Sequence, residues 1–133
     1  MDEFSRHVHG EERDAWLENA APAWARQLSR DDAEQVSATA LADPSFNVRV
    51  FGVQLLFDRV SEARGAQAAA ELVIRGDDLT PLLWSWMHAS PAGTVERRLD
   101  MIRAELEARK GGLAPEQRQR VDRLLCPPGK RCR

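Results

Sequence analysis

The sequence has little of what a cysteine-based scaffold or metal site requires. Only two of its 133 residues are cysteines, Cys126 and Cys132, and both lie close to the end. Residues 1–125 therefore have no disulfide framework, and a chain of this length can bury a sufficient core without one. The C-x5-C spacing lacks the partner ligands of a zinc knuckle. We expect two free thiols or one disulfide within the tail.

Long apolar runs and strand patterns are also missing. No stretch approaches the roughly 20 apolar residues of a membrane span, and residues 1–20 lack the basic start and apolar run of a secretory leader. No segment alternates like a strand, and hairpin turns are absent. Together with the scarcity of cysteine, this predicts a cytoplasmic protein without membrane association. Arginine outnumbers lysine 17 to 2, which suggests a GC-rich, bacterial genome.

Known catalytic signatures are absent as well. The phosphate-binding and dinucleotide-binding glycine motifs, Gly-x-Ser-x-Gly, His-Glu-x-x-His and Glu-x-x-His do not occur. His7 and His9 stand two apart near several acids, but this spacing points both rings to one side only in an extended segment. A solvated N-terminus is the better interpretation. The sequence thus predicts no enzyme, no cofactor and no metal site.

What the sequence has in abundance is helical pattern. Residues 41–60 read LADPSFNVRVFGVQLLFDRV, in which Asp43-Pro44 separates two helices and the second is apolar almost all round. A helix of that kind belongs at the centre of a helical protein. We therefore predict a central, most buried helix over 45–63, with Pro44 at its first position and Gly65 marking its end.

Other start and stop signals surround this central helix. Ser29 can cap a helix with Asp31 and Asp32 in its first turn, and Thr80 can cap another that has Pro81 at its first position. Residues 1–10 look like a loose lead-in. Further helices are expected from the patterns at 11–20, around Trp24, and at 66–75, 94–110 and from 115 onward.

These patterns predict an all-α fold, a compact bundle of about six to seven helices. We expect a single helical domain over residues 1–125, followed by a flexible basic tail over 126–133.

One turn is similar to a known repeat. The pattern Leu41-Ala42-Asp43, Asn47-Val48-Arg49, Gly52 and Leu55-Leu56 resembles the hinge of a HEAT repeat over about 20 residues. The resemblance implies a short HEAT-like α-solenoid, in which stacked helix pairs bind proteins or nucleic acid. It also implies that Asp43 and Arg49 are structural neighbours across the turn.

Charge is distributed unevenly along the sequence. Residues 1–43 hold ten acids and four bases, whereas residues 91–133 hold six acids and eleven bases. Such an asymmetry suggests a charged partner. The alternative is that the two ends neutralise each other within the folded protein.

Tryptophan is frequent for a chain without tyrosine: Trp16, Trp24, Trp84 and Trp86. Tryptophan is favoured both in cores and at binding hot spots. Trp84 and Trp86 are about 200° apart on a helix, so both cannot face the core. One of the two is a candidate exposed anchor.

The leading hypothesis is a non-enzymatic protein-binding module. Its most concrete form is a small bacterial inhibitor or immunity-type protein that blocks a toxin or enzyme through an acidic surface. The candidate partner-binding residues are Glu11, Glu12, Asp14, Glu18, Asp31, Asp32, Trp84 and Trp86. The alternative is a nucleic-acid-associated regulator that uses the basic C-terminal helices, although acids are interleaved with those bases.

Overall fold

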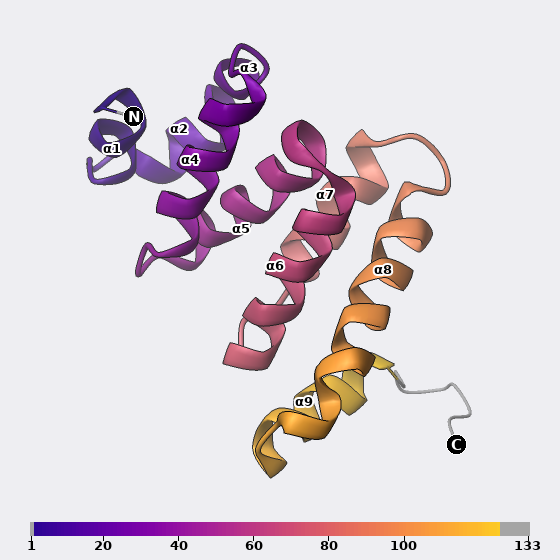
Figure 1. Cartoon of the computed structure of the whole chain (residues 1–133). Helices are drawn as coiled ribbons and strands as arrows, with labels where there is room; N and C mark the ends of the chain where they lie inside the picture. Colours follow the sequence, from indigo (N-terminus) through magenta and orange to yellow (C-terminus); the bar gives the residue numbers. More distant parts are fainter. Residues whose placement is uncertain (1, 126–133) are drawn as a thin grey trace. The chain divides into compact units, whose positions relative to one another are not determined.

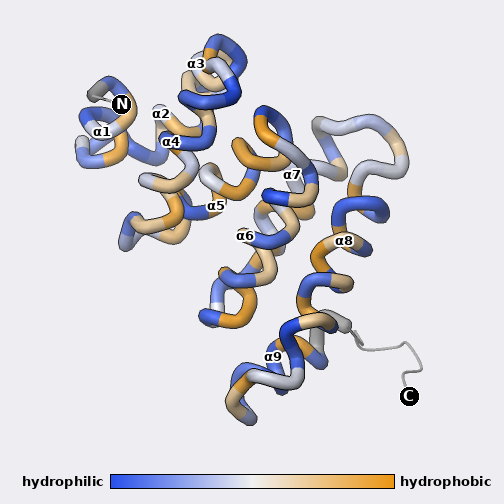
Figure 2. The backbone as a smooth tube through the Cα atoms, in the orientation of Figure 1, coloured by the Kyte–Doolittle hydropathy of each residue, from blue (hydrophilic) through white to orange (hydrophobic). Residues whose placement is uncertain are grey.

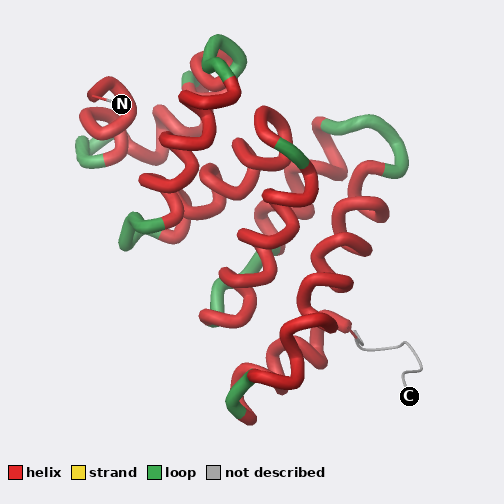
Figure 3. Tube along the Cα trace, in the orientation of Figure 1, coloured by secondary structure: helices red, strands yellow, loops and turns green. Residues whose placement is uncertain are grey.

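The computed structural model describes residues 2–125, and every regular element among them is a helix (Figures 1 and 3). The all-α prediction is confirmed. Figure 2 shows apolar and polar stretches alternating along the helices, as expected where each helix buries one face. The predicted basic tail, 126–133, lies outside the described residues.

The chain divides into two compact units, Met1–Gly65 and Ala66–Arg133. The single domain expected from length stays a prediction. The described part holds nine α-helices, more than the six to seven expected, and one of the additional helices lies in the first 25 residues, which form three short helices instead of two. The elements are α1 (Asp2–Val8), α2 (Arg13–Asn19), α3 (Ala21–Ala25), α4 (Arg30–Leu41), α5 (Phe46–Leu55), a π-helical turn (Leu56–Val60), α6 (Glu62–Arg75), α7 (Thr80–Ala89), α8 (Thr94–Arg109), a 3-10 turn (Lys110–Gly112) and α9 (Pro115–Leu125).

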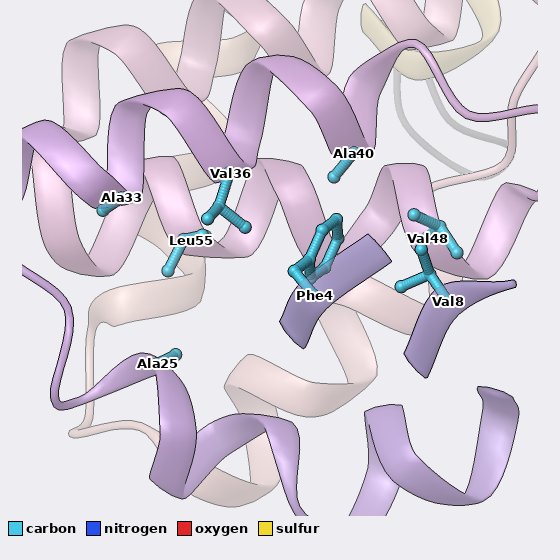
Figure 4. Close-up of a cluster of buried hydrophobic side chains, with 8 residues drawn as sticks. All are labelled: Phe4, Val8, Ala25, Ala33, Val36, Ala40, Val48 and Leu55. Carbon is cyan, nitrogen blue, oxygen red and sulfur yellow. The ribbon is translucent and has the colours of Figure 1, made fainter. Parts of the chain in front are cut away.

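The first ten residues are not a loose lead-in, and that prediction is wrong. Residues 2–8 form α1, whose Phe4 and Val8 lie one turn apart and are buried. Figure 4 shows both side chains pointing from α1 toward Val36, Ala40 and Val48 of the core. A seven-residue helix is too short for its apolar period to stand out in the sequence.

Phe4 lies at the centre of an aromatic cluster in the first unit. Its ring stacks on Trp24 and on Phe51, with centroids 5.8 Å apart in each pair, and meets the edge of Trp16 at 6.1 Å. The indole N–H of Trp24 donates to Glu3 at 3.1 Å. The cluster thereby joins α1, α2, α3 and α5.

The closest helix pair in this unit is α4 with α5. A side chain at Gly52 would place its Cβ 2.9 Å from Cβ of Ala40, so glycine is what allows the two backbones to approach. At the start of α4, Ser29 Oγ accepts the N–H of Asp32 at 3.1 Å, which confirms the predicted cap.

The turn between α4 and α5 is held by two side chains. The Asp43 carboxylate accepts the N–H of Ser45 at 2.8 Å, while Arg49 donates to the carbonyls of Asp43 at 3.0 Å and Pro44 at 2.8 Å. Asp43 and Arg49 are neighbours, as expected, whereas membership of the HEAT family stays a prediction. Pro44 lies before the N-cap Ser45, so it is not the first residue of α5.

The predicted central helix over 45–63 is interrupted. The α-helix ends at Leu55 and continues as a π-helical turn, which the bond from Ser61 N–H to the Leu56 carbonyl closes at 2.9 Å. Ser61 is extended, and its Oγ caps the new helix α6 by accepting the N–H of Arg64 at 3.1 Å. Gly65 therefore lies inside α6, and its expected role as a stop is wrong.

In the second unit, the helix predicted over 66–75 is part of α6, which buries a face of small residues: Ala66, Ala69, Ala70 and Val73. The helix ends at Arg75, and Gly76, with a φ of 105°, forms a Schellman turn in which the Asp77 N–H bonds to the Leu72 carbonyl at 2.9 Å. Arg120 of α9 donates to the Ile74 carbonyl at 2.8 Å.

The surface helix predicted over 94–110 is confirmed as α8. Ile102 and Leu106 are buried, and Glu105 pairs with Arg109 along the helix. Val95 and Leu99 are only half-buried, because Thr94 and Arg98 complete the inner face instead.

We predict that Phe4→Ala lowers the free energy of unfolding by about 3–5 kcal/mol, because it removes the centre of the aromatic cluster. Chemical denaturation monitored by circular dichroism measures this change. A stability equal to that of the parent would mean that α1 is not part of the core.

Gly65→Ala is expected to destabilise the protein by about 1–3 kcal/mol, because a Cβ there would overlap the Phe57 ring. At an open helical site the same substitution stabilises by up to about 1 kcal/mol, so the sign is diagnostic. Gly111→Ala serves as the control, since nothing lies within 4 Å of its Cβ position. Equal denaturation midpoints for the two variants would contradict the close contact.

Candidate functional site

The six candidate acids fall at two places in the first unit. Glu11 and Glu12 occupy the turn before α2, while Asp14 and Glu18 follow on that helix. Asp31 and Asp32 lie in the first turn of α4. Figure 3 shows the turns before α2 and α4 at different corners of this unit. The acids thus form two patches.

Each patch borders its own hollow. Glu11 and Glu12 line one of 420 Å³ together with Arg6, His7 and Trp16, and the His7 ring stacks on Trp16 at 4.5 Å. The second hollow, of 260 Å³, is lined by Glu3, Trp24, Leu28, Asp32, Gln35 and Val36. A half-buried tryptophan beside carboxylates is common to both.

The carboxylates of Glu11, Glu12, Glu18, Asp31 and Asp32 are exposed and form no ion pair with any described residue. The bases of this unit are used differently. Arg13 pairs with Asp14 at 3.2 Å and Arg64 with Glu34 at 2.9 Å. Arg49 and Arg59 donate to backbone carbonyls, the latter to Leu28 at 2.7 Å.

The sequence gives this unit twelve acids and seven bases. Two of those bases pair with one acid each, and an arginine that donates to a carbonyl stays charged, so the unit keeps the excess of acids that its composition gives.

Asp14 is the exception among the six acids. Its carboxylate accepts hydrogen bonds from Asn47 Nδ2 and Arg13 Nε, both at 3.2 Å. These hydrogen bonds, mainly the one from Asn47 and secondly the one from Arg13, lower the pKa of Asp14 below its ordinary value. Asp14 thus fastens α2 to α5, and we assign it a structural role instead of a free contact.

The two histidines near the N-terminus have different neighbours, since His7 stacks on Trp16 and His9 lies near Asp43. His9 is largely exposed and approaches Asp43 at 3.5 Å, where the same carboxylate already accepts the Ser45 N–H. Across residues 2–125 no group of three or more histidine, cysteine, aspartate or glutamate side chains is placed to hold a metal ion.

The two tryptophans of α7 have opposite environments. Trp84 is 62% exposed and Trp86 is 1% exposed, so the expectation that only one of them faces the core is confirmed. The guanidinium of Arg98 lies 5.1 Å from the centre of the Trp86 ring. Trp86 is therefore a core residue, and its prediction as a partner-binding residue is corrected. Trp84 remains a candidate partner-binding residue.

Two neighbours of Trp84 escaped the sequence reasoning. Met87 is 63% exposed, and the His88 ring meets the edge of Trp84 with centroids 4.1 Å apart. Their spacing of three and four residues from Trp84 was the available signal. A second signal is the stretch 79–95, which contains no Asp, Glu, Lys or Arg in a chain that is 30% charged.

The start of α7 depends on Asp78 instead of Thr80. Asp78 Oδ1 accepts both the N–H of Thr80 at 2.9 Å and its hydroxyl at 2.7 Å. The side-chain and backbone hydrogen bonds from Thr80 lower the pKa of Asp78. The predicted cap role of Thr80 is corrected, because its hydroxyl donates and Asp78 accepts.

The basic residues of the second unit are mostly neutralised in the described part. Residues 66–125 hold nine acids and nine bases. Arg103 approaches Asp100 at 3.7 Å, Lys110 approaches Asp122 at 2.7 Å, and Arg109 pairs with Glu105. The excess of positive charge in this unit comes from 126–133, which lie outside the described residues.

No family model, curated protein or solved structure matches this chain. None of the described helices has the length and apolar character needed to cross a membrane.

Asp78→Ala should destabilise the protein by about 1 kcal/mol at pH 7, more than Thr80→Ala, because it leaves the first N–H of α7 without its acceptor. The pKa of Asp78 is lower in the folded state, so its contribution is present above the unfolded pKa and is lost as the pH falls through the folded value.

Urea denaturation of both variants at pH 7 and pH 2.5 measures these differences. The gap between parent and Asp78→Ala should shrink at the lower pH. A larger loss for Thr80→Ala than for Asp78→Ala at pH 7 would contradict the assigned cap.

Proposed function

We propose that this protein is a non-enzymatic protein-binding module that uses the acidic surface of its first unit. Its most concrete form is a small inhibitor or immunity-type protein that occupies a basic site on a toxin or enzyme, in the cytoplasm of a bacterium. The proposal includes a HEAT-like pairing of α4 and α5, supported by the Asp43–Arg49 turn.

The observation that carries the proposal is the unequal use of charge in the first unit. Five exposed acids project without ion pairs, while four of the seven bases are engaged with the protein's own carbonyls and carboxylates. Solvated, unpaired carboxylates keep their full charge available to a partner. A negative field from these patches would steer a basic partner and raise its association rate.

The two acidic patches suggest how binding and inhibition would be combined. Each places carboxylates beside a half-buried tryptophan, Trp16 in one hollow and Trp24 in the other. Carboxylates can replace the phosphates of an anionic substrate in a basic cleft, and an aromatic edge nearby supplies apolar contact. Occupation of such a cleft would block the substrate without any chemistry by the inhibitor.

The alternative, a nucleic-acid-associated regulator, has weaker support. The bases of α8 and α9 would have to contact phosphates, but the described part of the second unit has equal numbers of acids and bases, and several are paired with each other. Only the residues after 125 carry uncompensated positive charge in the sequence.

The proposal is tested by reversing Glu11, Glu12 and Glu18 together to lysine. The variant leaves Asp14 in place, but Glu12 is the N-cap of α2, where an acid favours the helix dipole, so the stability of the variant is measured alongside. A partner captured by the parent protein from its own cells, identified and purified, should associate with the variant about 10-fold more slowly and with weaker salt dependence, as measured by surface plasmon resonance.

The matched control reverses three exposed acids of the second unit that lie beyond the first turns of their helices, Glu71, Asp100 and Glu107. It changes net charge equally and should leave the association rate within about 2-fold of the parent. If both variants associate equally slowly, net charge alone explains the effect and the acidic surface of the first unit is not the binding site. An unchanged association rate in the first variant would overturn the proposal. A mobility shift of DNA or RNA at low salt by the parent would favour the alternative.

A further inference from the structure

The outer face of α7 is the most apolar exposed surface in the described part of the chain. Among the described residues, Trp84 and Met87 are the two large hydrophobic side chains that are mostly exposed to solvent. With Thr80 and His88, both solvent-accessible, they follow one stripe of α7 at intervals of three and four residues. A tryptophan and a methionine exposed side by side on one helix face mark an interaction site more often than isolated apolar residues do.

This face is also without formal charge. The stretch 79–95 has no Asp, Glu, Lys or Arg, whereas Asp78 and Glu96 border it directly. The described helices α8 and α9 and the start of α4 all carry charged residues on their exposed sides. The α7 face is uncharged and apolar, whereas the surface proposed for the basic partner is acidic. The two surfaces therefore suit different partners.

Symmetry explains why a docking face would have no charge. In a two-fold interface, a residue near the axis meets its own copy, so any charged residue there would face the same charge. A different protein partner imposes no such restriction, and charged residues would then add specificity. A neutral face with an aromatic centre therefore fits a second copy of this chain best.

We propose that the α7 face pairs two copies of this protein into a symmetric dimer. A two-fold axis across the helix makes the two α7 helices antiparallel, which sets Trp84 of one copy close to Met87 of the other and opposes their dipoles. This proposal is independent of the acidic surface and leaves it free for the other partner.

The dimer is expected to be weak. α7 has ten residues, which is a length of about 15 Å. A contact of two such helices buries less than the roughly 800 Å² per partner of a stable interface. The association should therefore appear as a concentration-dependent equilibrium, with Trp84 as its main hot spot.

Sedimentation equilibrium of the full chain in reducing buffer tests the proposal, because the reductant removes any disulfide between tails. From about 1 μM to about 1 mM, the mass of the parent should rise from the 14.9 kDa of one chain toward twice that value. Trp84→Ala should raise the dimer dissociation constant at least about 30-fold while the circular dichroism spectrum stays the same.

Charge introduced near the two-fold axis is a second test. Met87→Glu and Met87→Lys should each stay monomeric alone, because the two like charges then lie about one helical turn apart across the interface, yet the two variants should associate when mixed at low salt. Ala38→Glu, on an exposed position of α4, is the matched control and should dimerise like the parent. A parent that stays monomeric over the whole range, or a dimer that Trp84→Ala leaves unchanged, overturns the proposal.

Discussion

The stacking of Phe4 between Trp24 and Phe51 is the contact on which the first unit depends. It brings a seven-residue and a five-residue helix, neither of which would be stable alone in water, against the longer α5. Trp16 completes the cluster and fixes α2 beside them. The turn that carries Glu11 and Glu12 has a defined position only because the helices on both sides of it are held by these rings.

Long helices with a one-sided apolar pattern could be read from the sequence. The small-residue face of α6 and the Ile102–Leu106 spacing of α8 each repeat over several turns, so local pattern and tertiary packing agree. The helix α1 could not be found in this way, because Phe4 and Val8 make only one helical repeat. The interruption at Ser61 was also missed, since an apolar run hides a break, although Ser61 itself is a good cap.

The candidate site was predictable in composition and not in detail. Acid enrichment near the N-terminus is visible in the sequence, and so is the geometric conflict between Trp84 and Trp86. The sequence could not show which bases are engaged, because Arg59 bonds to Leu28 and Arg64 to Glu34 across long separations. It also could not choose between the two tryptophans, since the choice depends on where Arg98 and α8 lie.

Three arginines share one task that the composition alone does not reveal. Arg49, Arg59 and Arg120 donate to carbonyls at or just beyond the C-terminal ends of α4, α3 and α6, where backbone acceptors lack helical partners. A guanidinium does not deprotonate in a protein and an amide carbonyl does not titrate, so these bonds are indifferent to pH. Acid therefore weakens the contacts that the Asp78 carboxylate makes at the start of α7, and it leaves these three arginine contacts unchanged.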